Sequence, residues 1–100
     1  MAQVKFLNYN KEKIPFRISY LAISGWQKET GKGLDDLEDI DKDMSLIEPL
    51  VFHSIDAGYR VNKQVNPFKR EDIGLILDEC LFDFIDGMGS FFQKGVKQKK

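Results

Sequence analysis

The sequence has very few of the residues on which cross-linking, metal binding and nucleophilic catalysis usually depend. Its 100 residues include one cysteine, Cys80, and one histidine, His53. A single cysteine cannot form a disulfide within the chain, and among leucines and phenylalanines it behaves as a small apolar residue of a reducing compartment. The cytoplasm is therefore the expected location.

An excess of charge of one sign and long hydrophobic runs are lacking as well. The formal net charge is −1, from 15 basic and 16 acidic residues, so no overall field attracts nucleic acid or an anionic membrane. No run approaches the roughly 18 apolar residues of a membrane span, and residues 1–13 have no apolar core typical of a signal peptide. We therefore expect neither nucleic acid nor a membrane among the partners.

The chain does contain enough apolar material for one small core. Hydrophobic residues make up 42% of the sequence and charged residues 31%, which is typical of a globular protein rather than a disordered one. A chain of this length is the usual size of one domain. We expect residues 1–100 to form a single domain, with 95–100 as a flexible tail, because the closing KGVKQKK has no means of ordering itself.

The segment from Asp43 to Tyr59 is the most apolar part of the chain and predicts a central helix. Its apolar residues recur at the three- and four-residue spacings of one helix face. They include Met44, Ile47, Leu50, Val51 and Ile55. Ser45 and Glu48 have the spacing of a capping box, which places the helix start near Asp43 to Ser45. Gly58 predicts its end, since a glycine there can adopt the left-handed cap conformation.

Two short apolar segments near the N-terminus predict a β-hairpin. The arms are residues 4–7 and 14–18, and Asn10 in the polar run between them is placed for a turn. Apolar positions alternate along the second arm, which puts three apolar side chains on one face. These are Ile14, Phe16 and Ile18. An isolated hairpin is only marginally stable in water, so this face must pack against helices.

Two helices are expected between the hairpin and the central helix. Ser19 can cap the first, and Gly31 can stop it. The second, over residues 34–43, has six acidic residues and predicts a short helix with a solvated acidic face. Asp39, Asp41 and Asp43 have the spacing of calcium ligands in an EF-hand, but Met44 stands where that loop needs a glycine. The solvated face is therefore the better interpretation.

The last long helix is predicted from Glu71 to Ile85, where the apolar pattern resumes after a polar loop. Gly87 and Gly89 are expected to interrupt it before a short final segment, 90–94. The predicted fold class is thus α+β, an N-terminal β-hairpin packed on a small bundle of three to four helices.

The sequence contains no convincing catalytic or metal-binding set. His53 lies among apolar residues, where a hydrogen-bonded core or boundary histidine is far commoner than a general base. No sequence signature supports a thiolate pair of His53 with Cys80. The carboxylates between residues 78 and 86 follow the polar face of a helix, whereas acid/base catalysis needs one buried and one solvated carboxylate. We expect no enzyme, no cofactor and no metal site.

Three stretches have the order and motifs of a known family. They read IPFRISYLAISGWQKETGKGLDDLED, LIEPLVFHSIDAGYR and KREDIGLILDECLFDFI. The shared features are the aromatic Trp26 near a helix end, Glu-Thr-Gly at 29–31, Glu-Pro-Leu at 48–50, Ala-Gly at 57–58 and Glu-Asp-Ile at 71–73. With these features residues 14–86 resemble the small tail assembly chaperones of long-tailed bacteriophages.

The resemblance implies a function in binding. Proteins of that family coat the very long, largely helical tape measure protein in the host cytoplasm and keep it soluble. They help tail-tube subunits polymerise around it and leave before the virion is complete. By this resemblance the expected partners are the tape measure protein, tail-tube subunits and further copies of the chain itself, and the protein is not expected in the mature virion.

A chaperone of this kind needs apolar surface to offer, and the C-terminal part of the chain has more large apolar side chains than one short helix requires. The candidate partner-binding residues are Phe82, Phe84, Met88, Phe91 and Phe92. The alternative is that all five complete the core, because large exposed apolar patches are rare on monomers.

Two other classes of protein stay open. One is a structural virion component such as a head-tail connector or tail terminator, whose self-complementary surface the sequence does not distinguish from that of a chaperone. The other is a small enzyme, which would need a bound metal or a titrating nucleophile.

Overall fold

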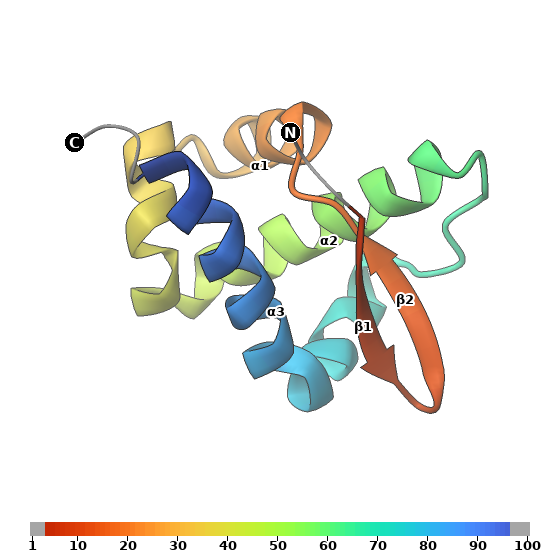
Figure 1. The fold of residues 1–100 in the computed structure, drawn as a ribbon. Coiled ribbons are helices and arrows are strands. Elements are labelled where there is room, and N and C mark those ends of the chain that lie inside the picture. Colours follow the sequence, from red (N-terminus) through yellow and green to blue (C-terminus); the bar gives the residue numbers. More distant parts are fainter. Residues whose placement is uncertain (1–3, 97–100) are drawn as a thin grey trace.

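A β-hairpin opens the fold and three α-helices follow it (Figure 1). The structure is a computed structural model that describes residues 4–96, apart from the side chains of 38, 39, 41 and 90–96. In chain order the elements are β1 (Lys5–Tyr9), β2 (Glu12–Phe16), α1 (Tyr20–Thr30), the 3-10 helix η1 (Leu34–Lys42), α2 (Met44–Val61), the 3-10 helix η2 (Arg70–Asp72) and α3 (Ile73–Val96). The predicted α+β class is confirmed.

The hairpin has its turn at the position that the sequence predicts. Asn10 and Lys11 connect the strands with φ angles of 53° and 66°, the pair of left-handed conformations that matches the twist of a two-residue hairpin. Leu7 pairs with Ile14, and both side chains are buried against the helices. The polar turn is thus held away from the core while the strands contribute to it.

Helix α2 is the central element, as predicted. It contacts α1 on one side and β2, η1 and α3 elsewhere; Figure 1 shows it running between α1 and the hairpin. The cap, however, is Asp43 and not a Ser45–Glu48 box. Ser45 donates its backbone N–H and its hydroxyl to Asp43 Oδ1 over 3.1 and 2.7 Å. The carboxylate of Asp43, two positions earlier, satisfies the first turn, which leaves Ser45 inside the helix.

Gly58 does not end α2, which continues to Val61. It is buried, and a β-carbon there would lie 2.7 Å from the carbonyl carbon and oxygen of Pro15. The glycine therefore allows α2 to pack directly on the backbone of β2. The sequence does not reveal this role, because a glycine near the end of an apolar run also fits a helix end.

Helix α1 has the expected limits and packs antiparallel to α2. Ser19 is its N-cap residue, although the Ser19 side chain makes no cap hydrogen bond. Gly31 ends it with a φ of 74° and donates its N–H to the Gln27 carbonyl over 2.8 Å. At the same end, buried Trp26 donates its indole N–H to the Leu46 carbonyl over 2.9 Å. This bond fixes the end of α1 on the start of α2.

Helix α3 is continuous, so the predicted break at Gly87 and Gly89 is wrong. A β-carbon at Gly87 would lie 2.8 Å from Cζ of Phe16. Gly87 therefore makes room for a core ring, and packing outweighs its low helix propensity. The helix includes residues 95 and 96, which were expected in the tail, while 97–100 lie outside the described residues.

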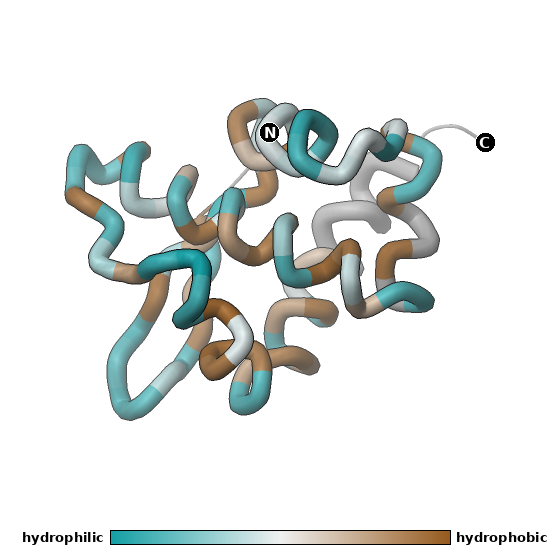
Figure 2. The backbone as a smooth tube through the Cα atoms, turned by 180° about the vertical axis from the view of Figure 1, so that it is seen from behind, coloured by the Kyte–Doolittle hydropathy of each residue, from teal (hydrophilic) through white to brown (hydrophobic). Residues whose placement is uncertain are grey.

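Hydropathy follows this architecture closely. In Figure 2 the most hydrophobic backbone lies along α2 and the first turns of α3, while the hairpin turn is hydrophilic. The largest buried side chains come from every layer and include Trp26, Phe16, Phe84, Leu7, Leu50 and Ile55. Within residues 4–96, none of the helices is both long enough and apolar enough to cross a membrane.

Candidate functional site

The five predicted partner-binding residues do not form one surface. Phe84 and Met88 are 0% and 4% exposed and belong to the core. The Phe84 ring lies 5.1 Å from that of Phe16, on the face of α3 that packs against β1. These two are therefore corrected to core residues, because they continue the three- and four-residue spacing of the buried positions Ile73, Ile76 and Cys80. The side chains of Phe91 and Phe92 lie outside the described residues.

Phe82 is the predicted residue that the structure places on the surface. Its side chain is 77% exposed. Leu75, which the sequence analysis did not single out, is 60% exposed and lies about two helical turns earlier on the same side of α3. The available signal was the phase of the helix, since both residues fall out of step with the buried positions. Together they form an apolar pair on the outer face of α3.

Carboxylates surround this apolar pair. The exposed positions of α3 between 73 and 89 recur every three and four residues and so make one face. They are Gly74, Leu75, Asp78, Glu79, Phe82, Asp83 and Asp86. This stretch of α3 has no lysine or arginine. We call these seven residues the outer face of α3.

One of these carboxylates is already engaged within the fold. Glu79 Oε2 accepts a hydrogen bond of 3.2 Å from the backbone N–H of Asn10 in the hairpin turn. Within the described residues, no hydrogen bond or ion pair is made by the side chains of Asp78, Asp83 and Asp86. Their charges are therefore available to a partner.

The single histidine is part of a polar cluster that joins three elements. His53 Nε2 on α2 lies 3.0 Å from Glu29 Oε1 on α1, and the second oxygen of Glu29 pairs with the Arg70 guanidinium of η2. The guanidinium also lies over the Phe52 ring, 5.5 Å from its centroid, a favourable cation–π geometry. The interpretation of His53 as a hydrogen-bonded boundary residue is confirmed.

Charge pairing decides the protonation of Glu29 in this cluster. Burial alone would raise the pKa of its carboxyl group, but the hydrogen bonds from Arg70 and His53 outweigh burial and lower the pKa below its ordinary value of 4.5. Glu29 is thus a stabilised carboxylate that links the Arg70 guanidinium to the His53 imidazole. It lacks the raised pKa that a general acid working near neutrality requires.

Cys80 is occupied elsewhere. Its thiol donates to the backbone carbonyl of Asn8 over 3.1 Å, and burial, with the nearby Glu79 and Asp83, raises the pKa of the thiol. A thiol with a raised pKa is a poor nucleophile. No hydrogen bond within the described residues connects Cys80 with His53.

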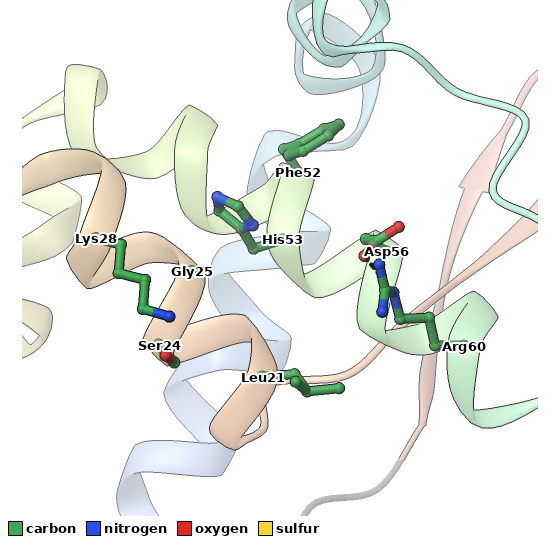
Figure 3. A pocket seen from close by; sticks show the side chains of 8 residues that line it. All are labelled: Leu21, Ser24, Gly25, Lys28, Phe52, His53, Asp56 and Arg60. Carbon is green, nitrogen blue, oxygen red and sulfur yellow. Dashed lines mark hydrogen bonds and ion pairs between the residues drawn. The ribbon is translucent and has the colours of Figure 1, made fainter.

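A groove of about 450 Å³ lies between α1 and α2 (Figure 3). It is lined by Leu21, Ser24, Gly25 and Lys28 from α1 and by Phe52, His53, Asp56 and Arg60 from α2. Figure 3 shows Lys28 and Arg60 on opposite sides of His53. Arg60 is held by Asp56 across one turn, Nε to Oδ2 2.8 Å. Ser24 and His53 both line the groove, but no hydrogen bond joins them among the described residues. The sequence analysis missed the groove because its two walls come together only in the fold.

The described side chains include no group of three or more histidine, cysteine, aspartate or glutamate residues that could hold a metal ion. The outer face of α3 is the candidate binding surface, because it combines exposed apolar side chains with exposed carboxylates. Comparisons of the chain with profiles of known protein families, with characterised proteins and with solved structures found no match.

Proposed function

We propose that this protein is a tail assembly chaperone of a long-tailed bacteriophage, which binds the tape measure protein and keeps it soluble during tail-tube assembly. It works in the host cytoplasm, meets tail-tube subunits on the growing complex, and leaves before the virion is complete. It acts by binding and needs no catalytic residue, cofactor or metal.

The observation that carries this proposal is the exposed apolar pair, Leu75 and Phe82, on a helix whose opposite side already completes the core. Large apolar side chains that are mostly exposed and recur on one helix face favour an interaction site. A client helix can lay its own apolar residues along this face, as helices do when they pack. The resemblance of residues 14–86 to the chaperone family supports the same conclusion.

Repetition of weak contacts supports binding to a very long client. Two apolar side chains provide modest affinity at one site. Many copies of the protein along one filament would gain by effective concentration what each contact lacks. Homo-oligomers or arrays on the client are therefore part of the proposal.

Co-expression with the tape measure protein of the same phage tests the proposal. We expect the tape measure protein to be soluble and co-purify with this protein, and to aggregate without it. Purified virions analysed by mass spectrometry should contain the tape measure protein and lack this one. A tape measure protein equally insoluble in both cases would refute the proposal, and this protein at stoichiometric level in virions would favour a head-tail connector or tail terminator instead.

A further inference from the structure

We propose that the outer face of α3 recognises a basic amphipathic helix, whose apolar stripe is bordered by lysine or arginine. That this helix belongs to the tape measure protein rests on the proposed function; its chemistry rests on the arrangement of apolar and acidic residues on α3.

The apolar pair lies along the middle of the outer face. At about 3.6 residues per turn, Leu75 and Phe82 are displaced by only about 20° around the helix axis and by about 10 Å along it. Asp78 falls on one side of the line that joins them. Glu79, Asp83 and Asp86 fall on the other. An apolar ridge with carboxylates along both borders matches a partner helix with an apolar stripe and cations along both borders.

The charge pattern is unfavourable for α3 on its own. Glu79 and Asp83 are four residues apart, and Asp83 and Asp86 are three apart, so like charges are neighbours on the helix surface and destabilise it slightly. A partner that places cations beside them would relieve this repulsion. Because the same residues border an apolar ridge, a correctly placed cation also fixes the register of the partner helix.

The same pattern argues against other occupants. Anionic lipid headgroups and nucleic acid phosphates would be repelled by the four carboxylates. A purely ionic partner would leave Phe82, which is 77% exposed, uncovered. An acidic or neutral helix could cover the apolar ridge but would form no ion pairs with the carboxylates beside it. A helix with both an apolar stripe and basic borders can cover the apolar ridge and pair with the carboxylates beside it.

Three synthetic peptides of equal length and helicity provide the test, with fluorescence anisotropy as the measurement. One has leucine at positions spaced seven apart with flanking lysines, the second has the same leucines with flanking glutamates, and the third has the lysines with serine in place of leucine. We expect the first to bind at least about tenfold more tightly than either of the others. The second peptide lacks the exposed charge pairs, and the third lacks the burial of the apolar pair.

Variants of the protein assign that affinity to α3. Phe82→Ser should abolish binding of the first peptide. The double variant Asp83→Asn/Asp86→Asn should weaken it several-fold and make it less sensitive to added salt, because fewer ion pairs are screened. The matched control Asp35→Asn/Glu48→Gln removes two carboxylates from η1 and α2 and should leave binding unchanged.

Two results would overturn the inference. Equal affinity for the lysine- and glutamate-flanked peptides would show that charge has no role. Concentration-dependent dimers that Phe82→Ser abolishes would show that a second copy of the chain covers this face. The proposed function can fail separately. If the basic peptide binds at α3 but the tape measure protein is not kept soluble, the inference about α3 stands and the tape measure protein is refuted as the client. If the tape measure protein is kept soluble and the charge variants have no effect, the proposed function stands and the recognition of a basic helix is refuted.

Discussion

The imidazole of His53 lies directly against Gly25, so closely that a β-carbon at that position would be 2.5 Å from Nδ1. The contact lets α2 place a polar ring between itself and α1 while Nε2 of the same ring reaches Glu29. The absence of one side chain thus permits both the packing of the two helices and the polar cluster that joins them to η2.

Gly25→Ala should destabilise the protein by about 1 to 3 kcal/mol, because the inserted methyl group overpacks the contact. The gain of about 1 kcal/mol in helix propensity offsets only part of this cost. Urea denaturation followed by circular dichroism measures the change. The double variant Gly25→Ala/His53→Ala should recover part of the loss, and no recovery would show that the imidazole is not the obstacle.

Gly58→Ala should be more damaging than Gly25→Ala. The obstacle at Gly58 is the backbone of Pro15, 2.7 Å away, and a strand backbone cannot rotate aside as a side chain can. We expect a loss of about 3 kcal/mol or more in the free energy of unfolding. The matched control is Gly74→Ala on the exposed side of α3, where nothing lies within 4 Å and a gain of up to about 1 kcal/mol is expected. Equal effects at both positions would contradict the close approach of α2 to β2.

Two phenylalanines of α3 should respond oppositely to truncation. Phe84→Ala should cost about 3 to 5 kcal/mol because it leaves a cavity beside Phe16. Phe82→Ser should change stability by less than about 0.5 kcal/mol, as expected for a surface position. Thermal unfolding of the two variants side by side is sufficient. A destabilised Phe82→Ser would place that ring in the core and remove it from the proposed binding face.

Much of the fold could be predicted because periodicity encodes it. The spacing around Leu50 identified the central helix, the alternation around Ile14 and Phe16 the hairpin, and Gly31 the end of α1. The helix stops predicted at Gly58 and Gly87 are wrong. Gly58 and Gly87 fit a helix stop by their local sequence, yet each instead accommodates a residue of the hairpin that is distant in sequence, which no local pattern reveals.

The candidate site was only partly predictable, for two different reasons. The exposure of Phe82 and burial of Phe84 follow from helix phase, since Phe84 is in step with Cys80 and Phe82 is not; this information was present in the sequence. The pairing of Glu29 with His53 and Arg70 was not, because it depends on the register of α1 against α2 and on the position of η2.

Acid should weaken the polar cluster of Glu29, His53 and Arg70. The pKa of Glu29 is lowered in the folded protein below 4.5, since hydrogen bonds from Arg70 and His53 outweigh the opposing effect of burial. A depressed pKa stabilises the fold above the ordinary value, and this contribution is lost as the pH falls through the folded-state pKa, below about 4.5. For a partly exposed pair it amounts to at most about 1 kcal/mol.

Glu29→Gln should therefore be less stable than the wild type at pH 7 and should show a smaller further loss between pH 5 and about pH 3. Urea unfolding across this range measures it. Glu48→Gln serves as the control, because Glu48 makes no side-chain hydrogen bond within the described residues. If the free energy of unfolding depended on pH identically in Glu29→Gln and the wild type, the stabilising role assigned to the Glu29 carboxylate would be refuted.

The central claim is that the outer face of α3 binds the client, and the most direct test compares two exposed apolar residues on different faces. Phe82 is on α3, and Leu21, 56% exposed, is on α1. The measurement is the soluble fraction of the tape measure protein co-expressed with the wild type, with Phe82→Ser or with Leu21→Ser, each variant first shown to unfold as the wild type does. We predict that Phe82→Ser alone lets the client aggregate. Aggregation with Leu21→Ser and full solubility with Phe82→Ser would move the binding surface to the groove between α1 and α2 and contradict the assignment to α3.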